Sequence, residues 1–544
     1  MAPPRLKVAK KNRNAVKLID LDDYLEAADS HEEAMRKHRA GDSAKALRFA
    51  DRALDVYAQG LAKFPRSFDL AYNKARLELE KATDPVFSGA LDVAPITVLR
   101  QALGSHNYAL ELEPTNADTL FNTAQVLTGI AEIIAEDSEA HGSEAIKNIE
   151  QALELQARCF EIQQAAFTKS RLELEQAMHE TAEHQTPQSD SENTPVGANS
   201  ESQKNVSQEE QWVSIEEPVT AETLLETIIA QIEALSALCS ILSSSLDFSP
   251  DASDSSATAL SWIDSYSQKL LTQILPTLIS ENRQTLEPRL SDVVLPRAVF
   301  MGNYLELSFR ASAIDVGKYK QELDDAFTQP GLDAGSEDVL MASARALLSF
   351  NSALADLPAL VPSNTATETH AALRWKILIE SQSRLSSVAS QPDADRHTVA
   401  MTHLLRGDIS LLLQVLAYPP IAHPQARTTT SQLLKHAEVY YRNASKLFGV
   451  LGRSTNEERL VCEFKGAVVS VLQQITADQA AAGSSSGQNN GGTVLGVAAS
   501  PDQIELALRP VLKAKGERWV RDHVEEIVSE GLVIPEVFSA IIHG

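Results

Sequence analysis

Three pairs of alanines, with seven residues from one alanine to the next, recur early in the chain. Seven residues are close to two turns of an α-helix, so both side chains of a pair return to nearly the same helix face. A small side chain on that face lets a neighbouring helix approach closely. These pairs predict helix crossings of one kind at intervals along the chain, which is typical of a helical repeat protein. The pairs are Ala46 and Ala53, Ala102 and Ala109, and Ala145 and Ala152.

Proline and turn residues separate the predicted helices. In the stretch 108–127, Pro114 ends one helix because proline has no amide hydrogen to continue the hydrogen-bond ladder. Asn116 or Asp118 can cap the helix that follows. Spacings of three and four place the residues that pack this second helix on one face. They are Leu120, Thr123, Ala124 and Leu127.

This arrangement resembles the tetratricopeptide repeat family, which has small residues at fixed positions of two helices and a proline that closes the unit. The matching positions are Ala109, Pro114, Leu120 and Ala124. The resemblance covers residues 20–180 as three interrupted repeats, and residues 216–478 only weakly. It implies an all-α fold, a solenoid of antiparallel helix pairs with a degenerate helical-repeat C-terminal half.

The repeats depart from the family pattern in three places. The first repeat begins near Ala27, and its second helix runs on to Pro65, beyond the usual length. Residues 81–95 form an insertion between the two helices of the second repeat. The third repeat has an expanded loop before Ser143, and its second helix extends towards Met178, where it can end the array.

Beyond residue 216 the helical pattern continues while the repeat pattern fades. Thr220 can cap a regular helix whose apolar stripe contains Leu225, Ile228, Ile229, Ile232, Leu235, Cys239 and Leu242. Further helices are predicted over 257–284, 293–313, 336–356, 367–389, 396–417, 428–448 and 455–477, the first of them kinked at Pro276. Helix breakers between them include Pro288, Pro296, Pro330, Pro419, Pro420 and Pro424. Ala437 and Ala444 repeat the seven-residue spacing as a remnant of the pattern.

Composition sets the segment boundaries. Residues 1–19 form a basic arm without acids, and the polar, Ser-rich stretch 184–211 is too poor in aliphatic residues to order itself. We therefore divide the chain into a basic disordered arm at 1–19, the repeat domain at 20–180, a disordered polar loop at 181–215, the degenerate repeat region at 216–478, a flexible Gly/Ser/Asn loop at 479–500 and a C-terminal helical pair at 501–544.

Charge and composition exclude several kinds of binding partner and indicate a cellular compartment. Over the 544 residues, 43% are hydrophobic and only 5% aromatic, which favours helix over strand. A net charge of −26 argues against direct binding of nucleic acid or of an anionic membrane. We expect no membrane span and no signal peptide, because no apolar run reaches the roughly 18 residues that a span needs. Cys159, Cys239 and Cys462 are expected as buried free thiols, which places the protein in the cytoplasm or the nucleus.

The chain contains no recognisable catalytic constellation, so we predict a protein that is not an enzyme and that needs no metal or cofactor. Residues 483–487 satisfy the GxSxG pattern of a serine nucleophile, but they lie in a Gly/Ser/Asn linker without the required strand and helix. The histidines have no metal-ligand spacing, and no glycine-rich phosphate loop is present.

Some members of the tetratricopeptide family hold the acidic tail of a heat-shock protein in a clamp of Lys, Asn and Arg. At the matching positions this chain has His31 and Met35 instead of Lys and Asn on the first helix, and Asp118 and Asn122 instead of the two basic residues. Asn73 alone fits. The resemblance therefore does not extend to a receptor for carboxylate tails.

The function that we expect is a non-enzymatic interaction scaffold or chaperone-like adaptor, which binds a peptide or client protein in a helical groove. The missing clamp cations and the acidic composition favour a basic client. Asn73 and Asn122 are the predicted partner-binding residues, because the first helices of successive repeats line the inner face of a solenoid. The alternatives are a structural subunit of a larger complex and, in a different class, an unrecognised helical enzyme. A pocket with paired carboxylates or a His-carboxylate pair of perturbed acidity would favour the enzyme.

Overall fold

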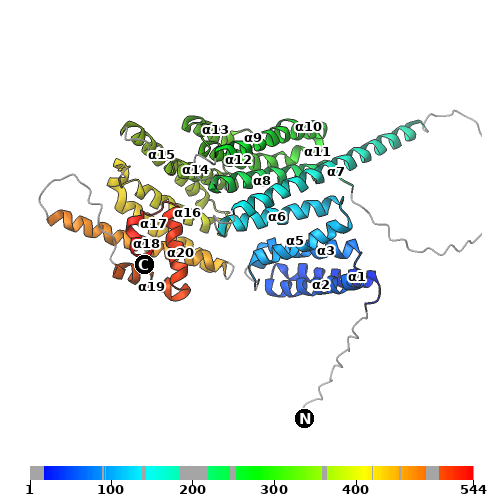
Figure 1. Cartoon of the computed structure of the whole chain (residues 1–544), viewed down its shortest axis with the longest axis horizontal. Coiled ribbons are helices and arrows are strands. Elements are labelled where there is room, and N and C mark those ends of the chain that lie inside the picture. Colours follow the sequence, from blue (N-terminus) through cyan, green and yellow to red (C-terminus); the bar gives the residue numbers. More distant parts are fainter. Residues whose placement is uncertain are drawn as a thin grey trace, which may run out of the picture.

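The computed structural model describes residues 18–88, 91, 93–137, 142–183, 218–245, 253–357, 364–419, 421–452, 455–485 and 501–542. These residues form helices and no strand, so the predicted all-α class is confirmed (Figure 1). Residues 1–17, 184–217 and 486–500 lie outside the described residues, and the disorder predicted for the arm and the two loops stays a prediction there.

The first six long helices form three stacked pairs, in which each helix packs against its partner (Figure 1). All six alanines of the predicted pairs are fully buried. Asn116 caps the third pair as expected, since its Oδ1 accepts a hydrogen bond from the amide of Thr119 at 2.9 Å. The pairs are α1 (Leu21–Arg39) with α2 (Ser43–Lys63), α3 (Phe68–Thr83) with α5 (Pro95–Leu112), and α6 (Ala117–Asp137) with α7 (Gly142–Glu183).

Close helix approach in the first pairs also depends on Gly60. A Cβ atom at this position would lie 2.9 Å from Leu70 and 3.2 Å from Tyr24, so α2 can touch both α1 and α3 only without a side chain here. The insertion between α3 and α5 contains the short helix α4 (Pro85–Ser88), and Phe87 is fully buried in the core of the first repeat. The insertion is therefore anchored to the repeat domain at this residue.

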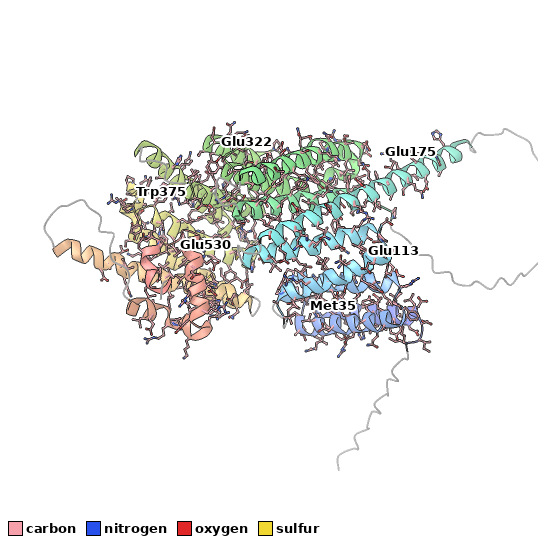
Figure 2. The ribbon with its side chains drawn as sticks, in the orientation of Figure 1. Met35, Glu113, Glu175, Glu322, Trp375 and Glu530 are labelled. Carbon is pink, nitrogen blue, oxygen red and sulfur yellow. The ribbon has the colours of Figure 1, made fainter. Side chains whose placement is uncertain are left out.

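The helix α7 does not end the array, because α8 (Ala221–Ser245) packs along it and α12 (Leu290–Arg310) packs along α8. The C-terminal part of α7 projects beyond its neighbours, where Leu172 and Leu174 are exposed (Figure 1). Figure 2 labels Glu175 on this projecting part.

The apolar helix α8 corrects the expectation that no apolar run in the chain is long enough to span a membrane. Its residues Ala221–Ser244 have a mean hydropathy of 1.6 and are long and apolar enough to cross a membrane. The predicted apolar stripe accounts for this high hydropathy, and most of the stripe is buried against α7 and α12. In the part of the chain that the structure describes, α8 is the core helix of a helical stack.

Between α8 and α12 the chain forms a series of shorter helices with π-helical and 3-10 turns among them. Near Pro276, where a kink was predicted, a π-helical turn at Leu270–Ile274 separates α9 (Ser253–Lys269) from α10 (Leu275–Glu281). Short turns α11 (Arg283–Leu286) and η4 (Glu287–Arg289) follow. Pro296 does not break the helix as predicted but lies inside α12, where burial of the residues after it, such as Phe300 and Leu305, outweighs one lost hydrogen bond.

The rest of the chain differs from the prediction in three ways. Helix α13 was not predicted, and α18 continues to Ser485, into the segment assigned to a flexible loop. The C-terminal helical pair consists of three helices, because Gly516 and Gly531 adopt positive φ and interrupt it. The helices are α13 (Val316–Thr328), α14 (Glu337–Ala355), α15 (Asn364–Ala389), α16 (Arg396–Val415), α17 (Pro424–Leu451), α18 (Asn456–Ser485), α19 (Pro501–Lys515), α20 (Glu517–Ser529) and α21 (Pro535–Ile542).

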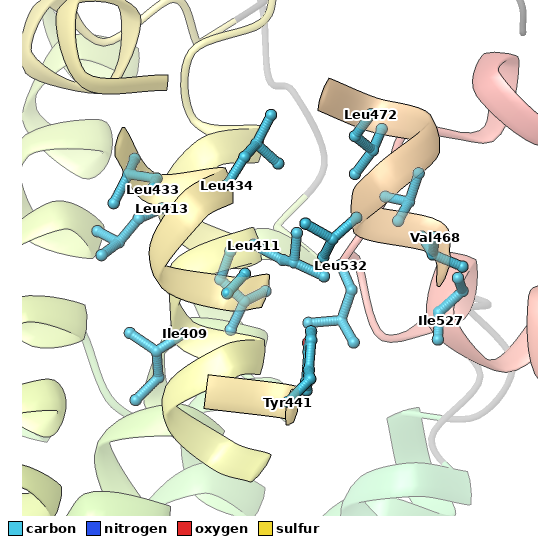
Figure 3. Close-up of a cluster of buried hydrophobic side chains, with 14 of the residues drawn as sticks. Ile409, Leu411, Leu413, Leu433, Leu434, Tyr441, Val468, Leu472, Ile527 and Leu532 are labelled. Atoms are coloured by element: carbon cyan, nitrogen blue, oxygen red, sulfur yellow. The ribbon is translucent and has the colours of Figure 1, made fainter. Parts of the chain in front are cut away.

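The C-terminal helices share a large core of branched aliphatic side chains (Figure 3). Ile409 and Leu411 of α16, Leu434 of α17, Val468 of α18 and Ile527 of α20 meet there. The remnant pair, Ala437 and Ala444, is fully buried in α17. At its closest point α17 covers Gly407 of α16, where a Cβ atom would lie 2.4 Å from the ring of Tyr441.

Candidate functional site

A cavity of about 900 Å³ lies between the inner helices α3, α6, α8 and α12. Small side chains on α8 make room for it, because Ala230, Ala234 and Ala237 recur at spacings of three and four on the cavity side of that helix. Asn303 of α12 closes the far wall by donating to Ser236 Oγ of α8 at 2.9 Å. The cavity is thus a groove framed by rigid helices rather than by loops.

Carboxylates, hydroxyls and side-chain amides form the polar lining of this groove. Glu132 of α6 and Glu233 of α8 are its charged residues, and no Lys, Arg or His is among the described residues that line it. Burial raises the pKa of Glu233, which has no ion-pair partner within the described residues. The site is therefore anionic, and a cation placed in it would relieve the desolvation of Glu233.

Gln156 of α7 adds an unsatisfied acceptor to the groove. Its side chain is among the lining residues and only 2% exposed, and its Oε1 atom has no hydrogen-bond partner in the described part of the chain. A buried polar atom without a partner costs about 1–3 kcal/mol. A ligand that donates a hydrogen bond to Gln156 Oε1 would recover that cost.

Two arginines on the inner helices are already paired. Arg76 of α3 lies 2.5 Å from Glu32 Oε2 and 3.3 Å from Glu80 Oε2. Arg310, at the end of α12, lies 2.9 Å from Glu306 and 2.7 Å from Asp356. These guanidinium groups do not offset the negative charge of the groove lining.

The predicted contact residues Asn73 and Asn122 lie near one another but outside the cavity lining. They are half-buried on the neighbouring helices α3 and α6, and Asn122 Nδ2 donates to the hydroxyl of Tyr72, beside Asn73, at 3.5 Å. Asn122 precedes Gln125 by one turn on α6, and Gln125 does line the cavity. The two asparagines therefore lie on an approach to the groove along α3 and α6.

The structure does not place the first-helix clamp positions in the groove. Met35 is fully buried in the core of the first repeat (Figure 2), and the ring of His31 lies 6.3 Å from the ring of Phe49 in α2. These side chains face the partner helix of their own pair. Comparison with a carboxylate clamp therefore fails on geometry at these positions as well as on residue type.

Sequence reasoning missed Glu132, Gln156 and Glu233, together with the contribution of α8 and α12. A signal was present on α8, where the alanines at 230, 234 and 237 lie opposite the predicted apolar stripe. Nothing comparable marked α12, because Pro296, which lines the cavity, was interpreted as a helix breaker.

The described residues do not bring a His, Cys, Lys or Arg into the lining of this groove. Those residues contain no cluster of His, Cys, Asp and Glu that could hold a metal ion. Burial raises the pKa of Cys159 and Cys462 to about 12, so both are protonated at neutral pH. Gly483 and Ser485 of the GxSxG pattern belong to α18, and Gly487 lies outside the described residues.

Comparison with known proteins gives few relatives. No family model matches the chain. UPF0656 protein C926.02 of Schizosaccharomyces pombe is 32% identical over 161 residues, which cover 28% of this chain and 34% of that protein. The chain thus matches about a third of the length of that relative, whose name describes no activity.

Among solved structures, a circular tandem repeat protein with novel repeat topology and enhanced subunit contact surfaces is similar over 94% of this chain and 98% of its own. The identity is 13% and the TM-score is 0.26. The two folds differ too much at this score for the likeness to support any conclusion about this chain.

Proposed function

We propose that this chain is a non-enzymatic adaptor or chaperone-like protein of the tetratricopeptide type, which binds a basic segment of a client protein in the groove between α3, α6, α8 and α12. The observation that carries the proposal is the lining of the groove, with Glu132, Glu233 and the unsatisfied Gln156 Oε1 and without a cationic side chain among its described residues. Lysine and arginine supply the positive charge that such a lining lacks, and they donate hydrogen bonds to carboxylates and to an acceptor such as Gln156 Oε1.

The dimensions of the groove support a peptide ligand. A volume of about 900 Å³ is at the upper end of the range for small-molecule pockets and can hold several side chains. The approach past Asn73 and Asn122 extends it along α3 and α6, where amide groups can bind a peptide backbone as donors and acceptors. We place this function in the cytoplasm or the nucleus, where free thiols persist.

The test is a calorimetric titration of the full chain with an acetylated peptide of alternating lysine and alanine. We expect binding that weakens as salt is added, and a dissociation constant about tenfold higher for the variant Glu132→Gln with Glu233→Gln. A smaller loss is expected for Asn73→Ala with Asn122→Ala. All these variants should keep the parent melting temperature.

The matched control is Glu111→Gln with Glu113→Gln, which removes the same charge from exposed positions at the end of α5. Equal weakening in the control and the groove variant would show that binding follows net charge alone, and the groove assignment would then be wrong. Equal binding of a glutamate–alanine peptide would contradict the basic ligand.

A further inference from the structure

A second cavity, of about 640 Å³, lies on another side of α8, between α7, α8 and α9. Leu238 and Leu242 of α8 line it, whereas Ala237 and Ile241 line the first groove. Successive positions on a helix point about 100° apart, so the two sets belong to different faces. Buried Leu238 and Ile263 give the second cavity an apolar floor.

An exposed tryptophan forms one wall of this cavity. The side chain of Trp262 is 44% exposed, and its ring centroid lies 5.3 Å from that of Tyr266. Tyr266 is itself held in place, because its hydroxyl donates to Gln231 Oε1 of α8 at 2.7 Å. The indole is therefore supported from below with much of its surface left open, as in side chains that anchor protein interfaces.

Two glutamates line the same cavity from α7. Glu150 and Glu154 are exposed, lie one turn apart and have no ion pair in the described part of the chain. Like charges at this spacing destabilise a helix slightly, so a cation between them is favourable. No basic side chain is among the described lining residues.

We propose that this cavity binds an arginine of a protein partner together with an adjacent aliphatic side chain of that partner. The guanidinium stacks on the indole of Trp262 and forms hydrogen-bonded ion pairs with Glu150 and Glu154. The aliphatic side chain covers Leu238 and Ile263. Arginine fits better than lysine because its planar group stacks on an aromatic ring and pairs with carboxylates in a forked geometry. This site is independent of the groove on the other face of α8.

The experiment uses the full chain labelled with 5-fluorotryptophan and observed by fluorine NMR. The protein has four tryptophans, and the variant Trp262→Phe assigns the resonance of Trp262. The probe is a short acetylated peptide with the repeated sequence Leu-Ala-Arg. We expect the Trp262 resonance to shift on titration, and the dissociation constant from that shift to rise about tenfold in Glu150→Gln with Glu154→Gln.

Two controls define the outcome. The groove variant Glu132→Gln with Glu233→Gln and the exposed variant Glu111→Gln with Glu113→Gln should leave the Trp262 titration unchanged, and a thermal melt of each variant verifies its fold. An unmoved Trp262 resonance, or an unchanged dissociation constant in Glu150→Gln with Glu154→Gln, would overturn the proposal. A Leu-Ala-Lys peptide of equal affinity would overturn the choice of arginine.

Discussion

The first helix pairs and the C-terminal helices each contain a tyrosine that donates to a buried carboxylate with a cation beside it. In the first, Tyr57 of α2 donates to Glu32 of α1 at 2.7 Å, and Arg76 of α3 pairs with the same carboxylate at 2.5 Å. In the second, Tyr441 of α17 donates to Asp408 of α16 at 2.7 Å, and Lys465 of α18 pairs with it at 2.9 Å.

The two networks differ in their access to water. The side chain of Arg76 is 33% exposed, whereas that of Lys465 is 8% exposed and also lies 3.6 Å from Glu530 of α20. Burial alone would lower the pKa of Lys465, but Asp408 and Glu530 together raise it above its usual value. Removing one charged side chain from a solvent-exposed network costs little unfolding free energy, whereas removing one from a buried, closed network costs much more.

The largest loss of stability is expected when the network of Tyr441, Asp408 and Lys465 loses its cation. The substitution Lys465→Ala removes the counter-charge of Asp408, whose side chain is only 15% exposed. Loss of the partner of a buried charge typically costs about 3–5 kcal/mol of unfolding free energy. Denaturant unfolding followed by circular dichroism measures this cost.

The double variant Lys465→Met with Asp408→Asn is the control, since it removes the buried cation together with its closest acid. It should recover much of the stability that Lys465→Ala loses. A double variant as unstable as the single one would mean that lost packing, rather than an uncompensated charge, dominates at this site.

The contrast between the two regions also shows what the sequence could predict. Small residues at fixed spacing and prolines between helices are local signals, and they predicted the pairs from α1 to α7 well. The C-terminal helices pack through Leu, Ile and Val, which occur at many spacings, so the third C-terminal helix was missed. Helix α13, whose Tyr319 and Phe327 are buried in a separate core, was missed as well. The partners Tyr441, Asp408 and Lys465 are far apart in sequence and cannot be paired without the fold.

The candidate groove was predictable only in part, for the same reason. Its acidic character could be predicted from the composition, and its position on the inner face could be predicted from the repeat pattern. Its lining depends on α8 and α12, which come after the region of clear repeats, and on Gln156, which looks like any other polar helix residue. Asn73 and Asn122 were predicted by register, and they lie at the approach instead of in the cavity.

An intermediate loss of stability is expected at the close helix crossings of the pairs from α1 to α7. Ala109 is fully buried, and Ala109→Phe should lower the unfolding free energy by at least about 1–3 kcal/mol through overpacking. The matched substitution Ala444→Phe tests a crossing with the same spacing in α17. If the first variant melts like the parent, the helix register in the repeat domain is wrong.

The smallest effect is expected at Arg76, and it tests the comparison most directly. In Arg76→Ala, Glu32 keeps the hydrogen bond from Tyr57 and lies 3.5 Å from Arg36, while water can reach the space that the guanidinium leaves. Because Arg76 is partly exposed, the loss should be about 1 kcal/mol or less, and smaller still at high salt. Denaturant unfolding at two salt concentrations, with Lys465→Ala measured in parallel, gives the ratio of the two costs. A loss at Arg76 equal to that at Lys465 would show that solvent access does not separate the two networks, and that the first one is as closed as the second.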